Sequence, residues 1–175
     1  LAHQFIVDKS NTMNAMRWLT GDIPLQKQAA VLKEICEKGE DKLTQYYNTC
    51  IKTSESLSGS VKQLFDATIL LQAKIHYYCM KGVIIFGEAF DKMYSKEYLS
   101  AFMDFGKSAE MFDTADSAMR GSEYGVWQGF YFNDCFADVK HTAYMVRKMM
   151  SMARELGDNA RHDRWYRDAV YSKED

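Results

Sequence analysis

Pro24 is the only proline among the 175 residues of this chain. Proline is excluded from helix interiors because its ring removes a backbone N–H and clashes with the preceding turn, whereas loops use it freely. A chain of this length with a single proline therefore predicts long helices and few connections. Pro24 follows Asp22, an arrangement that suits a helix start, where a carboxylate can cap the first turn and the missing N–H costs nothing.

Apolar or small residues then recur in alternating steps of four and three, which is the spacing of a helix face that packs against another helix. The first such helix starts at Pro24. A second is expected to open with Ser60 and Gln63 as a capping box and to stop near Tyr94. The inward positions of the first helix are Leu25, Ala29, Leu32, Cys36, Gly39, Leu43, Tyr46 and Cys50.

A third helix is expected after Ser95, ending where Gly121 would supply a left-handed cap, and a fourth is expected to end at Gly157 in the same way. Residues 3–19 predict a shorter fifth helix. The inward positions of the third helix are Tyr98, Phe102, Phe105, Ala109, Phe112, Asp116 and Met119, and those of the fourth are Phe136, Val139, Ala143, Val146, Met150 and Ala153.

Short connections force neighbouring helices to run antiparallel. The pattern therefore predicts an all-α fold, an antiparallel up-and-down bundle of four or five long helices. A hydrophobic fraction of 47% is enough for one core, so residues 1–175 are expected to form a single domain. Because the chain opens on Leu1 rather than methionine, we expect a piece excised from a larger multidomain protein.

Charge and composition exclude several classes of function. The formal net charge is −2, and basic residues alternate with acidic ones, so we expect no nucleic-acid partner. The most apolar stretch, residues 69–86, is interrupted by charged and polar side chains, so no membrane span is expected. The four cysteines show no metal-binding spacing and are expected to be buried free thiols: Cys36, Cys50, Cys79 and Cys135.

Asp134, Asp138 and His141 are spaced to stack on one face of the fourth helix, as metal ligands would be. A di-iron site in a bundle needs two Glu-x-x-His pairs, and the sequence contains none. We therefore expect a solvated face here, and neither a metal nor a cofactor.

Glycines inside predicted helices each cost about 1 kcal/mol relative to alanine, so some other contact must offset them. One interpretation is that Gly39, Gly82, Gly87 and Gly106 let helices or aromatic rings approach closely. The alternative is a ligand pocket between helices near Gly82, Gly106 and Asp116. Asp116 is expected to form an ion pair with Arg120, one turn further along.

Residues 120–134 form the segment richest in aromatic side chains, with one glycine on either side of Trp127. Trp127 is expected to plug an end of the bundle, because buried aromatic area is strongly stabilising. The alternative is an exposed platform that stacks on a sugar ring. The candidate ligand-binding residues are Trp127, Tyr124, Tyr131, Asp134 and Arg120. The tail, residues 161–171, is expected to dock as part of a terminal helix.

The Gly125, Val126, Trp127 turn, with long helices before it and an aromatic pair and an amphipathic helix after it, resembles the helical region of carbohydrate-active enzymes. The family most similar is the glycoside hydrolase family 115 α-glucuronidases. Val126 departs from the basic residue usual there, and Phe130 and Tyr131 depart from methionine. The resemblance covers about the last hundred residues and implies that the acid and base residues lie in a barrel outside this chain.

No phosphate loop, nucleophile elbow or catalytic triad is visible in the sequence, so no catalytic residue is assigned. The resulting hypothesis is a non-catalytic helical accessory domain of a glycan-processing protein, with carbohydrate or an adjacent catalytic domain as partner. The resemblance implies a periplasmic or secreted location. Two alternatives remain open: an independent helical enzyme or ligand carrier with an inter-helix pocket, and a structural oligomerisation module.

Overall fold

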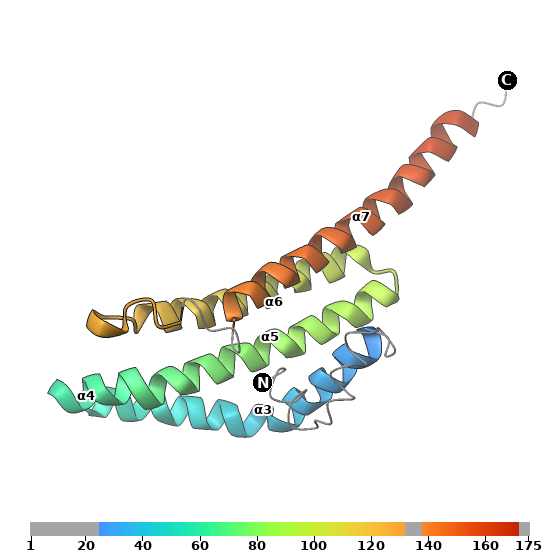
Figure 1. Cartoon of the computed structure of the whole chain (residues 1–175). Helices are drawn as coiled ribbons and strands as arrows, with labels where there is room; N and C mark the ends of the chain where they lie inside the picture. The colour runs from blue at the N-terminus through green and yellow to red at the C-terminus, as the bar shows by residue number, and fades with distance from the viewer. Residues whose placement is uncertain (1–24, 132–137, 172–175) are drawn as a thin grey trace, which may run out of the picture.

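In the computed structural model, residues 25–131 and 138–171 are described (Figure 1). This part of the chain forms four long helices and contains no strand, which confirms the predicted all-α bundle. The elements are α3 (Leu25–Ser56), α4 (Gly59–Phe65), the π-helical turn η1 (Asp66–Leu70), α5 (Leu71–Tyr94), α6 (Tyr98–Gly121), the 3-10 turn η2 (Gly125–Trp127) and α7 (Val139–Tyr171).

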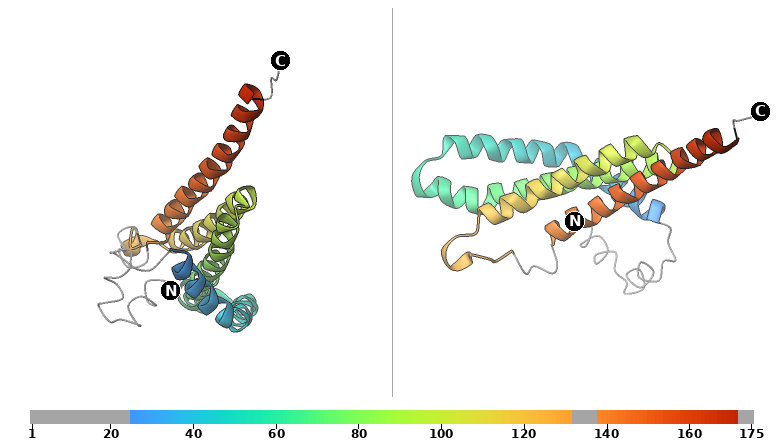
Figure 2. Two further views of the ribbon diagram at one scale, coloured as in Figure 1. Left: turned by 90° about the vertical axis from the view of Figure 1, so that its right-hand side faces the viewer. Right: turned by 90° about the horizontal axis from the view of Figure 1, so that it is seen from above.

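The long helices pack in the order in which they occur in the chain. α5 lies between α3 and α6, while α7 packs against α6 and touches α5 only lightly. α4, η1 and α5 follow one another without a break and form one long rod, which runs antiparallel to α3 (Figure 1). The C-terminal end of α7 extends past the other helices in each view (Figure 2). α3 and α7 are therefore edge helices, and α5 and α6 carry most of the core.

The core is centred on Phe105, whose side chain is fully buried. Its ring meets those of Phe86 and Phe90 edge to face, with ring centroids 5.6 and 5.5 Å apart. Such edge-to-face arrangements place the positive rim of one ring against the negative face of another. Fully buried alanines, such as Ala101 and Ala115 on α6, allow neighbouring helices to approach closely.

Several predicted helix ends are wrong. The second rod begins at Gly59, after Ser58, and no side chain caps it, so Ser60 and Gln63 lie inside the helix and form no capping box. Gly59 itself adopts φ +59°, a backbone conformation that glycine reaches without strain. The side chain of Lys62 instead donates a hydrogen bond of 2.9 Å back to the carbonyl of Ser54, at the end of α3.

Gly121 and Gly157 were both predicted to end helices, and neither does so through a left-handed conformation. Gly121 is the last residue of α6 but does not have a positive φ. α7 runs straight through Gly157, where an added Cβ would lie 3.1 Å from the Cβ of Tyr98. Gly157 is therefore a point of close approach between α7 and the start of α6, which a sequence pattern cannot distinguish from a cap.

Two of the helix-interior glycines confirm the expectation of close approach. A Cβ on Gly82 would lie 2.8 Å from the ring of Phe112, and one on Gly87 would lie 2.7 Å from the side chain of Lys33. At Gly106, the nearest atoms belong to Met150, 3.7 Å away. Side chains therefore fill the space at Gly82 and Gly106 that a ligand would need under the pocket alternative.

Some expectations lie outside the described residues. These are the predicted helix over residues 3–19, the start at Asp22 and Pro24, and the roles of Asp134, Cys135 and Phe136. The tail from 161 to 171 continues α7 as helix, but its side chains are not described, so its predicted docking is not tested.

Candidate functional site

The segment from Ser122 to Tyr131, here called the aromatic loop, leaves the end of α6 and projects from the end of the bundle (Figure 1). Trp127 is 57% exposed and Tyr124 is 66% exposed. The prediction that Trp127 plugs the bundle is therefore wrong. Gly125 and Gly129, on either side of Trp127, adopt φ +56° and +78°, backbone conformations that glycine reaches without strain.

The indole of Trp127 packs within the loop itself. Its ring meets the ring of Phe130 edge to face, with centroids 5.6 Å apart, and Phe130 in turn meets Tyr131 at 5.1 Å. Tyr131 is half-buried and packs against the core, so the far end of the loop returns to the bundle. The result is an exposed aromatic cluster supported at its base by one ring that contacts the core.

Glu123 holds the loop in shape. Its side chain is only 11% exposed, and its two oxygens accept backbone hydrogen bonds from Tyr131 N–H at 2.7 Å and Gly129 N–H at 3.1 Å. Arg120 lies 3.3 Å from the same carboxylate. Sequence analysis missed Glu123, because a glutamate in a loop carries no signal that it will bond to the backbone six and eight residues later.

Arg120 was a candidate ligand-binding residue, and its partners among the described residues include two carboxylates. Its guanidinium pairs with Asp116 at 3.3 Å, which confirms the predicted ion pair, and also with Glu123. Because both carboxylates are largely shielded from water, the two contacts connect α6 to the loop more firmly than an exposed pair would. Arg120 thus supports the loop from beneath.

A cavity of about 650 Å³, here called the loop cavity, opens beside the aromatic loop. That size falls within the range of roughly 300–1,000 Å³ typical of small-molecule sites. It lies where η1 and the start of α5 face the end of α6. Its lining residues are Gln63, Asp66, Ala67, Leu71, Lys74, Ala118, Gly121, Ser122 and Tyr124.

Asp66 is the acidic group of the loop cavity. Ser54 Oγ donates to its carboxylate at 2.5 Å, and Lys62 Nζ lies 3.0 Å away. The hydrogen bond from Ser54, together with the bond from Lys62, lowers the pKa of Asp66 below its usual value. Lys74 lines the same cavity, half-buried on α5, and pairs with no carboxylate among the described residues. The cavity therefore combines the carboxylate of Asp66 and the ammonium of Lys74 with the amide of Gln63 and the phenol of Tyr124.

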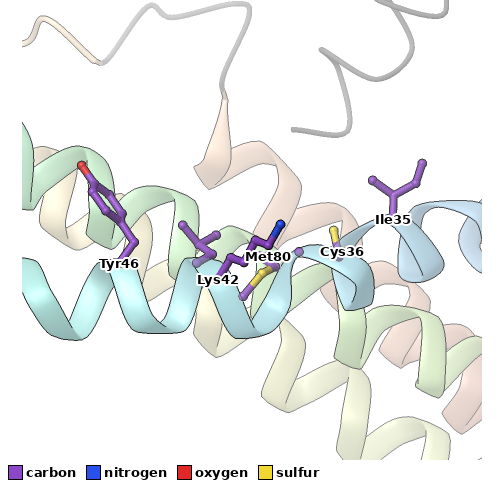
Figure 3. A pocket seen from close by; sticks show the side chains of 7 residues that line it. Ile35, Cys36, Lys42, Tyr46 and Met80 are labelled. Atoms are coloured by element: carbon purple, nitrogen blue, oxygen red, sulfur yellow. The ribbon is translucent and has the colours of Figure 1, made fainter.

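A second, apolar depression of about 350 Å³ lies along α3, with the buried side chain of Met80 of α5 among the residues that line it (Figure 3). The cysteine thiols beside it are not activated. Burial raises the pKa of Cys36, and it raises the pKa of Cys79 to about 11, so both thiols stay protonated near neutral pH. The residues that line the depression are Ile35, Cys36, Gly39, Lys42, Leu43, Tyr46 and Met80.

The suspected metal ligands on the fourth helix have other positions. Asp138 precedes α7 and accepts a hydrogen bond of 2.8 Å from the backbone N–H of His141, as an N-terminal cap does. Both side chains lie on an exposed face, as expected. Within residues 25–131 and 138–171, no three His, Cys, Asp or Glu side chains gather closely enough to hold a metal ion.

In the same ranges, no helix has the length and apolar content needed to cross a bilayer.

Comparisons of the chain with protein-family models, with curated proteins and with solved structures gave no match.

Proposed function

We propose that this chain is a non-catalytic helical interaction domain of a glycan-processing protein, and that the aromatic loop is its contact surface. The observation that carries the proposal is the exposed indole of Trp127 on a loop anchored by Glu123. A large aromatic side chain left in water loses the stabilisation that burial would give it, roughly 1.5–3 kcal/mol. An exposed indole that is held in place is therefore suited to bury its face against a ligand.

The chemistry around Trp127 matches a sugar better than a purely apolar partner. The C–H face of a pyranose ring stacks on an aromatic ring, while its hydroxyls need donors and acceptors beside it. The phenol of Tyr124 belongs to both the aromatic loop and the loop cavity, which adds the carboxylate of Asp66 and the amide of Gln63. Because Glu123 fixes the loop before binding, little ordering entropy is lost when a ligand binds.

A binding role fits the acids near the loop better than a catalytic one. Glu123 accepts two backbone hydrogen bonds, Asp116 pairs with Arg120, and Asp66 is held ionised by Ser54 and Lys62. General acid–base catalysis needs a carboxyl group that can exchange a proton with the substrate near the working pH. The pKa of Asp66 is lowered by its partners, and the oxygens of Glu123 and Asp116 already have partners in the fold, so the arrangement supports structure and binding.

Calorimetric titration of the chain with a panel of neutral and acidic oligosaccharides tests the proposal. We expect binding by the unaltered chain and an affinity loss of tenfold or more for Trp127→Ala, since tenfold corresponds to about 1.4 kcal/mol of lost stacking. Tyr46→Ala is the matched control, because Tyr46 is a similarly exposed aromatic on α3 and does not line the loop cavity. Absence of binding across the panel, or equal affinities for the two variants, would contradict the proposal.

A further inference from the structure

α7 carries two apolar faces, of which one is buried against the other described helices. The first face is buried and includes Val139, Ala143, Val146 and Ala153. The second consists of Met145, Met149, Met152 and Leu156, here called the outer seam. Its members follow one another in steps of four, three and four, which is the spacing of a coiled-coil contact line.

The outer seam faces solvent. Met145, Met152 and Leu156 are 45%, 48% and 43% exposed, and Met149 is partly buried at the edge of the core. At about 100° per residue, the four side chains fall within roughly 60° of the helix circumference, so they form one continuous stripe. Single exposed apolar residues are ordinary, but an aligned stripe of flexible methionines is typical of a contact surface. Among the described helices α7 is an edge helix, and none of them covers the outer seam.

Two charged residues beside the outer seam indicate what the partner is. Lys148 and Glu155 are both exposed, lie seven residues apart and therefore share one edge of the stripe. Neither forms an ion pair among the described residues, and the ammonium of Lys148 lies 4.7 Å from the centre of the Tyr144 ring. The outer seam thus has a positive group flanking one half and a negative group flanking the other.

A second copy of the same helix complements this pattern when it runs antiparallel. With the two-fold axis between Met149 and Met152, Lys148 of each copy faces Glu155 of the other, so the pair of opposite charges forms twice. In a parallel arrangement the two copies of this edge would lie on opposite sides of the contact line, so Lys148 of one copy would not meet Glu155 of the other. The charges therefore select the antiparallel orientation as well as the partner.

We propose that two copies of this chain associate through their outer seams, with the α7 helices antiparallel about a two-fold axis. The inference is independent of sugar binding, since it involves neither Trp127 nor the loop cavity. Equilibrium sedimentation of the 175-residue chain over a range of concentrations tests it. We expect a monomer–dimer equilibrium, weakened at least tenfold by Met152→Lys, which places a charge at the centre of the seam.

Met103→Lys is the matched control, because Met103 is 53% exposed on α6 and lies outside the outer seam. It should leave the dimer unchanged. Circular dichroism of each variant verifies that the helices are intact. A chain that is monomeric at every concentration, or a dimer that tolerates Met152→Lys, would overturn the inference.

Charge reversal tests the orientation. Lys148→Glu and Glu155→Lys should each weaken the dimer several-fold, and the double variant should restore it, because the exchanged charges again face each other. The single-variant effects should shrink as salt is raised. A double variant that dimerises no better than the singles would show that the two residues do not meet across the interface, and the antiparallel pairing would be wrong.

Discussion

At the scale of single residues, Asp104 is the main buried charge of the described bundle. Its side chain is 9% exposed and pairs with Lys92 of α5 and, at 3.0 Å, with Lys107 of its own helix. Burial alone would raise the pKa of Asp104, but the hydrogen bonds from the two lysines outweigh it, and the pKa is lowered. The pair connects α5 to α6 beside the core, where an unpaired carboxylate would be strongly destabilising.

The variant Asp104→Asn should lower the free energy of unfolding at pH 7 by about 1.5–3 kcal/mol, the range for a hydrogen bond to a charged group. A carboxyl whose folded pKa lies below its unfolded value of about 3.9 stabilises the fold above that pH and loses this contribution as pH falls through the folded pKa. Urea unfolding at a series of pH values should therefore show the difference between the two proteins shrinking below about pH 4.

Asp113→Asn is the comparison for that experiment, since Asp113 pairs with Arg147 on the exposed surface between α6 and α7. Its loss should cost about 1 kcal/mol or less, because water screens the pair. Equal costs for the two variants would show that burial does not strengthen the Asp104 pairs.

At the scale of elements, the rod formed by α4, η1 and α5 depends on its π-helical turn. In η1 the backbone N–H of Leu71 bonds to the carbonyl of Asp66, five residues back, instead of four. The extra residue shifts the helix face, so that Leu70 and Ala73 are buried next to Cys50 of α3, while Leu71, also buried, lines the loop cavity. Such turns are frequent at functional sites, and this one supplies Asp66 and Ala67 to the loop cavity.

Glycines test how tightly the helices pack. Gly82→Ala should destabilise the protein by about 1 kcal/mol, because overpacking against the buried ring of Phe112 exceeds the gain in helix propensity. Gly39→Ala should stabilise it by about 0.5–1 kcal/mol, because an added Cβ there meets nothing within 4 Å. Thermal or urea unfolding of the two variants measures both changes in stability. A stabilising Gly82→Ala would show that Phe112 can move aside.

At the scale of the whole molecule, the described helices form an open array, and among them the two edge helices, α3 and α7, each pack mainly against one neighbour. α5 and α6 have neighbours on two sides, whereas α3 packs mainly on α5 and leaves Val31, Ile35 and Tyr46 exposed. Local opening of a helix costs less free energy where fewer apolar contacts must be broken. Stability should therefore fall from the middle of the array to its edges.

Hydrogen–deuterium exchange measures this gradient. Backbone amides between Ala101 and Met119 of α6 should exchange most slowly, and those between Leu25 and Ile35 of α3 should exchange at least tenfold faster. If α7 pairs with a second copy, protection between Met145 and Leu156 should increase with protein concentration. Uniform protection across α3 and α6 would indicate that α3 is covered more fully than the array of described helices shows.

The sequence by itself determined the helices, because their signal is local. Alternating steps of three and four predict α3, α6 and α7 and most of their inward residues, including Cys36, Phe105 and Val146. The ion pair between Asp116 and Arg120 was also predictable, because the two residues lie one helical turn apart. The tertiary structure decided what depends on contacts between distant residues. Gly157 was predicted to end a helix, but α7 continues through it and the glycine allows close approach to Tyr98. Ser60 was predicted to cap a helix, but that helix begins at Gly59. Trp127 was predicted to be buried, yet it is exposed on a loop that Glu123 anchors and in which Gly125 and Gly129 have positive φ. Burial and backbone pairing across the fold set these outcomes, and no short-range pattern encodes them.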